Sequence, residues 1–65
     1  MNITQAGTTV YNAANQDEQI KAVFTEGEFE VLEALAKGQP VHALNIEGQT
    51  LANAVNKLIE RGYIG

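Results

Sequence analysis

Polar side chains at helical spacing occupy the end of the sequence, LANAVNKLIERGYIG, over residues 51–65. Lys57 and Arg61 are four residues apart, so a helix would place both cations on one face, where they could hold a phosphate. In the alternative interpretation, the two cations complement the dipole at the C-terminal end of that helix. Asn53 and Asn56 are poor helix formers, so either they contact a partner or they keep an exposed face free of charge.

The residue types present do not favour catalysis or metal binding. The chain contains neither serine nor cysteine, and His42 is its single histidine. No serine or cysteine nucleophile is therefore available for a histidine base to activate, and no thiolate is available as a metal ligand. The glycines are scattered and form no phosphate-binding loop. We therefore expect a protein with no enzymatic activity, no catalytic residues, no metal site and no cofactor.

Acidic residues form a second candidate surface in the middle of the sequence. Residues 16–37 contain six of the eight acids and two of the four bases, so this segment accounts for the whole net charge of −4. Glu26, Glu30 and Glu33 follow helical spacing on one face. This face is either a solvated surface or an acidic docking face for a basic partner. A nucleic-acid-binding protein usually carries a basic patch, which this composition does not favour.

The length of the chain limits it to one domain. At 65 residues, only about 60% of the unfolded surface can be buried, so the fold is marginal without a staple or a partner. Cysteine is absent, so no disulfide supplies that staple, and a homodimer is one hypothesis. No apolar run approaches the roughly 20 residues of a membrane span. The first sixteen residues also lack the basic and apolar segments of a signal peptide, so we expect a cytoplasmic protein that contacts no membrane.

Capping signals predict where the first two helices begin. Asn15 with Glu18, and Thr25 with Glu28, fit the capping box, in which a cap side chain and a later glutamate satisfy each other's free backbone N–H groups. Gly38 is a typical residue just after a helix end. The two predicted helices span residues 16–24 and 26–37.

The other segments are predicted from their composition. Residues 1–14 are expected to form a polar arm or a short strand, ahead of a helical domain over 15–65. The connection after Gly38 contains Pro40, which can begin a one-turn helix through residue 44. In the alternative interpretation, residues 41–46 are extended. A final helix is predicted over 49–61.

Apolar residues that recur every three to four positions predict the buried face of each helix. One core is expected from the second and final helices, made of Phe29, Leu32, Leu35, Leu51, Val55 and Leu58. Other residues assigned to inward faces are Ile20, Val23, Phe24, Ala36, Ala52 and Ile59.

Two stretches of the sequence together resemble a known family of regulators. FTEGEFEVLEALAKGQPV resembles the first helix of bacterial and phage helix-turn-helix regulators, and TLANAVNKLIERGYI resembles the third helix of winged-helix regulators. The latter helix typically ends in an arginine-glycine-aromatic-apolar step, matched here by Arg61 to Ile64. The two stretches cover about half of the chain. The resemblance implies a mainly α fold, a small bundle of three to four helices with one or two short strands.

The resemblance is to a degenerate form of that scaffold. Only eleven residues separate Gly38 from Thr50, about one helical turn too few for the family's second helix and turn, and no complete wing follows residue 65. By the same resemblance, base-contacting residues would lie at the start and along the outward side of the final helix. These positions are Gln49, Thr50, Asn53, Asn56 and Lys57.

Two hypotheses for function follow from these patterns. The first is a small non-catalytic regulatory or interaction module that acts by protein–protein contact on a degenerate helix-turn-helix scaffold. The second is a DNA-binding transcriptional regulator that uses residues 49–61 as its recognition helix and acts as a dimer. The short connection and the acidic middle segment favour the first hypothesis.

Overall fold

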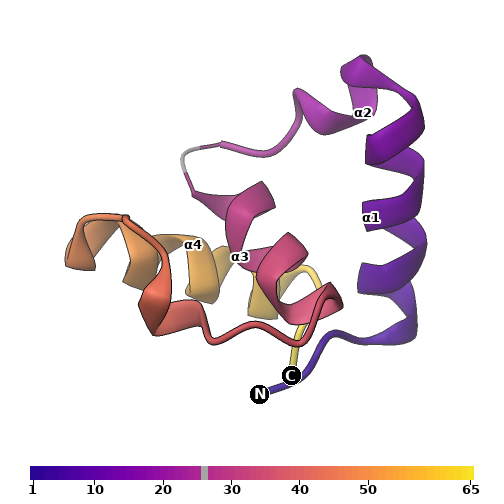
Figure 1. Ribbon diagram of the computed structural model, residues 1–65. Coiled ribbons are helices and arrows are strands. Elements are labelled where there is room, and N and C mark those ends of the chain that lie inside the picture. Colours follow the sequence, from indigo (N-terminus) through magenta and orange to yellow (C-terminus); the bar gives the residue numbers. More distant parts are fainter. Residues whose placement is uncertain (26) are drawn as a thin grey trace.

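Helix α3 (Glu28–Ala36) lies at the centre of the computed structural model, which describes residues 1–25 and 27–65. Helix α1 (Gln5–Gln16) packs against one side of α3, and helix α4 (Gly48–Glu60) packs against another (Figure 1). The prediction of a small, mainly helical bundle is confirmed.

Two short elements connect these three helices. Helix α2 (Glu18–Lys21) follows α1 directly and packs against it. The 3₁₀ helix η1 (Val41–Ala43) stands between α3 and α4 and packs against α3. The one-turn interpretation of this connection is therefore correct, and the extended alternative is wrong for residues 41–43. None of the described helices is both long enough and apolar enough to cross a lipid bilayer.

Residues 1–14 do not form the polar arm or strand that the sequence predicted. Instead α1 covers residues 5–16 and crosses the expected boundary between residues 14 and 15. The Thr4 hydroxyl caps this helix by accepting a hydrogen bond from the Gly7 N–H at 3.0 Å. Gly7 and Ala14 are buried two turns apart, with Val10 between them on the side that faces the core. This spacing is helical, and packing against α3 outweighs the weak β propensity of the segment.

The first predicted helix, over 16–24, is also wrong. Asn15 lies inside α1, which ends at Gln16, so Asn15 is not the cap of a helix. Asp17 instead begins α2, and its carboxylate accepts the Gln19 N–H at 2.9 Å. Val23, which was assigned to the apolar side, lies beyond α2 and is 60% exposed.

The second predicted helix exists but is shorter than expected. Its cap is Gly27, which has a φ of 77° and so adopts a left-handed conformation that glycine accepts readily. The helix ends where predicted, because Gly38 has a φ of 70° and its N–H donates to the Leu35 carbonyl. The next residue donates to the Ala34 carbonyl at 2.8 Å, which completes a Schellman motif.

The core lies between α3 and α4. Val31, Leu32 and Leu58 are fully buried, and Ala54 and Ile64 join them. Three of the six predicted core residues, Phe29, Leu32 and Leu58, are buried, and the other three are less central than expected. Phe29 is 9% exposed and lies against other aromatic rings, and the remaining three are half-buried residues packed around the cluster, namely Leu35, Leu51 and Val55.

The two ends of the described chain lie side by side (Figure 1). Ile3 and Ile64 form an antiparallel β-bridge, and Asn2 and Gly65 exchange two backbone hydrogen bonds of 2.8 Å. The Thr4 hydroxyl donates to the Gly62 carbonyl at 2.6 Å. This pairing anchors the start of α1 to the end of α4. It is a single β-bridge, and the predicted short strands do not form among the described residues.

Candidate functional site

The outward side of α4 carries a line of exposed polar side chains. Gln49, Asn53, Asn56 and Glu60 are all exposed and recur at intervals of three or four residues, so they share one face of the helix. The Gln49 side-chain amide donates to the Asn53 carbonyl oxygen at 3.1 Å. Three of the six predicted contact residues, Gln49, Asn53 and Asn56, therefore lie on one stripe.

Two apolar residues extend this stripe, and both differ from their predicted positions. Ala52 and Ile59 were expected to face inward, but both are exposed, and Ile59 is 48% exposed. Ala54 and Leu58 occupy the buried face instead. Successive residues turn by about 100° around a helix, so burial of Leu58 rotates Ile59 out of the core. We name the exposed set the α4 surface, made of Gln49, Ala52, Asn53, Asn56, Ile59 and Glu60.

The first turn of α4 is closed by its own cap. The Glu47 carboxylate accepts hydrogen bonds of 3.0 Å from the backbone N–H groups of Gln49 and Thr50, and of 3.2 Å from the Thr50 hydroxyl. These backbone hydrogen bonds, first that of Gln49 and then that of Thr50, lower the pKa of Glu47 from its ordinary value of 4.5. The hydroxyl of Thr50, a predicted contact residue, therefore donates to the Glu47 carboxylate of the same chain.

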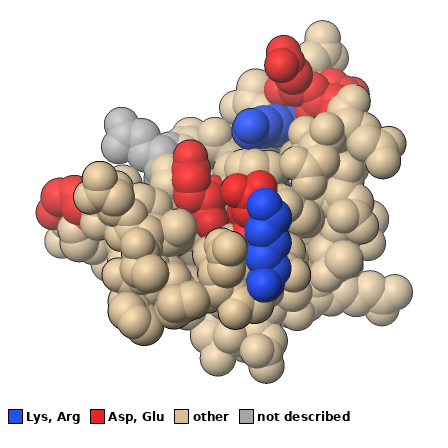
Figure 2. All heavy atoms as spheres, in the orientation of Figure 1, with Lys and Arg blue, Asp and Glu red and all other residues tan. Residues whose placement is uncertain are grey.

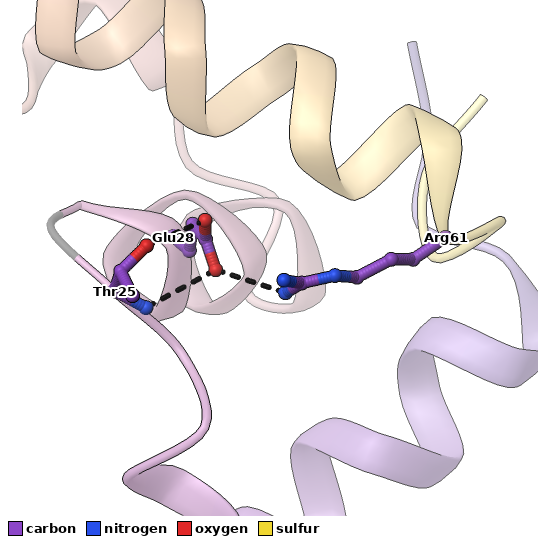
Figure 3. Close-up of polar contacts among 3 residues, drawn as sticks. All are labelled: Thr25, Glu28 and Arg61. Carbon is purple, nitrogen blue, oxygen red and sulfur yellow. Dashed lines mark hydrogen bonds and ion pairs between the residues drawn. The ribbon is translucent and has the colours of Figure 1, made fainter.

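Arg61, the C-cap residue of α4, forms an ion pair with α3. Its guanidinium Nη1 lies 3.0 Å from Oε1 of Glu28, a residue that is only 2% exposed (Figure 3). The same carboxylate accepts the Thr25 N–H at 3.1 Å and the Thr25 hydroxyl at 2.8 Å. Half of the predicted capping box is thus formed: Glu28 reaches back to Thr25, but the Thr25 hydroxyl donates to the glutamate instead of capping the helix.

This ion pair changes the interpretation of Arg61. The sequence offered a phosphate contact or a helix-dipole partner, and the structure places the guanidinium against a buried carboxylate of another helix. A buried carboxylate without a cation is costly, so Arg61 has a structural role. Lys57 is exposed and takes part in no ion pair among the described residues. It is the α4 cation that remains for contact with a partner.

A surface pocket lies beside Lys57, between α4 and the start of α3. Its volume is about 310 Å³. Among the described residues it is lined by Thr25, Glu28, Thr50, Asn53, Ala54 and Lys57. Ala54 is buried and was missed by the sequence analysis, because an alanine in a helix carries no signal that distinguishes a pocket floor from an exposed turn. The pocket adjoins the α4 surface through Asn53 and is large enough to receive one side chain of a partner.

The acidic face is only partly free. Glu30 is exposed, whereas Glu33 accepts a hydrogen bond of 3.1 Å from the Tyr11 hydroxyl and lies 3.7 Å from the Lys37 ammonium. Glu26, the third predicted member, lies outside the described residues. Glu33 therefore links α1 to α3, which leaves Glu30 as the described acid of this face with no such contact.

His42 lies exposed in η1. Within residues 1–25 and 27–65, no three His, Cys, Asp or Glu side chains converge as metal ligands would. No family model, curated protein or solved structure matches this chain, so its function is inferred from its own residues.

Proposed function

We propose that the chain is a small, non-catalytic regulatory or interaction module that binds a protein partner through the α4 surface. The proposal includes a degenerate helix-turn-helix scaffold, in which α3 and α4 correspond to the first and third helices and η1 replaces the second. It also includes a location in the cytoplasm.

The composition of the α4 surface is the observation that supports this proposal. It combines three uncharged amides with an exposed isoleucine, and its charged residue, Glu60, adjoins the exposed cation Lys57. Amides can hydrogen-bond a protein surface, and an isoleucine that is 48% exposed gains free energy when a partner covers it. Interface cores are depleted in charged residues, and the centre of the α4 surface fits that pattern.

The balance of charge argues against the alternative, a DNA-binding regulator. Affinity for DNA depends on how many phosphates the protein neutralises. Arg61 is held by Glu28, so Lys57 is the α4 cation available for a phosphate. Phosphate contacts from neighbouring elements normally hold a recognition helix in the groove, but η1 offers only His42 and α3 carries Glu30 and Glu33. The amides Gln49, Asn53 and Asn56 are what favours the DNA hypothesis.

A DNA titration tests the choice between the two functions. The protein is first used to select from a pool of randomised DNA duplexes, and the selected duplexes are then titrated by fluorescence anisotropy at low and physiological salt. We expect no enriched sequence and only salt-sensitive binding, weaker than about 10⁻⁶ M at physiological salt.

Two measurements accompany the titration. The variant Lys57→Ala serves as the comparison, because Lys57 makes no described ion pair. Light scattering on the same samples shows whether any DNA-bound species contains one copy of the chain or two. An enriched sequence bound at about 10⁻⁸ M or tighter, and bound more weakly by Lys57→Ala, would support the repressor and contradict the proposal.

A further inference from the structure

A shallow, largely apolar groove runs along α1. Helix α1 lies on a different side of α3 from α4 (Figure 1). The volume of the groove is about 610 Å³. Five residues of α1 line it together with Ile20 of α2 and Tyr63, and those of α1 are Gln5, Ala6, Thr9, Val10 and Ala13. We name this feature the α1 groove. Its apolar lining is the kind of surface that a helix of a partner covers.

Helix α1, which supplies most of the lining of the α1 groove, carries no charged side chain. No residue from 1 to 16 carries one. In the view of Figure 2, acids and bases appear over α2, near α3 and at the left end of α4, while the edge along α1 shows neither. The chain as a whole has a net charge of −4, so two copies repel each other through most orientations, but they can approach through this edge without facing like charges.

We propose that the α1 groove is the site where a second copy of this chain binds, with the two α1 helices antiparallel about a twofold axis. Such an interface uses the same residues from each copy. Ala6 and Ala13 are seven residues apart, and an axis that passes between Thr9 and Val10 sets Ala6 of one copy opposite Ala13 of the other. Small residues at these two positions allow the helices to approach closely, and Val10 fills the space near the axis.

The ends of α1 also suit an antiparallel pair. The first turn of α1 contains no acid and its last turn contains no base, so nothing on the helix itself complements its dipole. In the antiparallel pair, the exposed acids Asp17 and Glu18 that follow α1 lie near the N-terminal turn of α1 in the second copy. Negative charge at that position is stabilising, and the two helix dipoles oppose each other. Charge therefore favours the antiparallel over the parallel arrangement.

Sedimentation equilibrium over a range of concentrations tests this proposal. The wild-type chain should approach twice its mass of 7.0 kDa as the concentration rises. Ala13→Glu replaces a small residue by a long carboxylate at the contact with Ala6 of the second copy, which prevents close approach and buries a charge, so the dissociation constant should rise by about tenfold or more. Asn12→Glu makes a similar change one position away, on an exposed residue outside the groove, and should dimerise like the wild type.

Circular dichroism shows whether both variants retain the helical fold, and a crosslink gives a second readout. The chain has no cysteine, so Thr9→Cys introduces a single thiol beside the twofold axis, and it should form an intermolecular disulfide on oxidation. Asn12→Cys, on the outer side of α1, should not. A wild-type chain that stays monomeric, as expected if the groove binds a helix of another protein, would overturn the proposal. So would a dimer that Ala13→Glu leaves intact, or equal crosslinking of both cysteine variants.

Discussion

Among the described residues, Glu28 is the charged residue that the fold buries. Its carboxylate accepts three hydrogen bonds, two from Thr25 and one from Arg61. Removing Arg61 takes away the single cation among them. Truncating one partner of a buried ion pair costs about 2–5 kcal/mol. Because the Arg61 side chain is 40% exposed, solvent replaces part of the interaction, and Arg61→Ala should lower the free energy of unfolding by about 2 kcal/mol. Urea denaturation measures this change.

Two further variants give this prediction its controls. Lys37→Ala removes the ion pair with Glu33, whose side chains are 55% and 36% exposed, and should change stability by no more than about 0.5 kcal/mol. Glu28→Gln in the Arg61→Ala background removes the unpaired charge but keeps an acceptor for Thr25, so it should recover part of the loss. If Arg61→Ala costs no more than Lys37→Ala, the ion pair is not structural.

The Glu47 cap predicts a dependence of stability on pH. The pKa of Glu47 is lowered in the folded protein by the hydrogen bonds from Gln49 and Thr50. Its contribution to stability is therefore complete above the ordinary pKa of 4.5 and is lost as the pH falls through the lowered, folded value. The melting temperature of Glu47→Gln should lie below that of the wild type at pH 7, and the two should converge at acidic pH.

Thermal melts between neutral and acidic pH measure this gap. Glu60→Gln is the matched control, because Glu60 lies at the other end of α4, where a negative charge opposes the helix dipole. That variant should melt at or above the wild-type temperature at pH 7. A gap between the wild type and Glu47→Gln that stays constant with pH would exclude the charged cap as its cause.

Individual residues of the candidate site were predictable only where a local pattern fixes them. Asn53, Asn56 and Lys57 are exposed on α4 as their spacing predicts. The partner of Arg61 was not predictable, since Glu28 is 33 residues away in the sequence and the pairing depends on how two helices pack. The exposure of Ile59 depends on how α4 is rotated about its axis. The sequence alone does not determine which of the adjacent apolar residues, Leu58 or Ile59, faces the core.

At the scale of the elements, Gly7 fixes how α1 joins the end of the chain. A Cβ at this position would collide with the Tyr63 carbonyl oxygen and lie 2.8 Å from Cγ1 of Ile3. Alanine normally stabilises a helix relative to glycine by up to about 1 kcal/mol. Here Gly7→Ala must displace α1 from the bridge between Ile3 and Ile64, so we expect a net loss of about 1–3 kcal/mol.

Gly48→Ala makes the same chemical change as Gly7→Ala but should have the opposite effect on the free energy of unfolding. Gly48 begins α4, has no positive φ, and a Cβ there would meet nothing within 4 Å. Its substitution should leave stability unchanged or raise it by up to about 1 kcal/mol. Urea denaturation of both variants makes the comparison, and a Gly7→Ala variant as stable as Gly48→Ala would show that α1 does not require this close contact.

The elements that were predicted correctly carry strong local signals. Glycines after α3 and α4 end both helices through Schellman motifs, in which Gly62 and Tyr63 repeat the pattern of Gly38 and Gln39. By contrast, α1 was not predicted, because its buried side consists of Gly7 and Ala14 together with Val10 and Tyr11, which have high β propensity. Its helical conformation depends on contact with α3, which a local propensity does not describe.

For the whole molecule, the described charges divide the surface into regions with different properties. The α1 groove is uncharged, α3 carries exposed acid, and the α4 surface combines amides with an apolar residue. Steering by the net charge of −4 favours encounter with a partner of basic character and disfavours nucleic acid. We expect the α4 surface to contact a protein.

This contact can be tested by affinity capture from a nuclease-treated lysate of the native cells. The amount of bait is increased stepwise, and the captured proteins are quantified by mass spectrometry. The α4 variant is Asn53→Arg with Asn56→Glu, which leaves the net charge unchanged. Thr8→Arg with Asn12→Glu makes the same pair of charge changes on exposed α1 residues outside the groove. We expect a partner that the wild type and the α1 variant bind saturably, and that the folded α4 variant recovers at least about tenfold less. Equal recovery by the α4 variant, or no saturable partner for the wild type, would show that the α4 surface is not the site of protein contact.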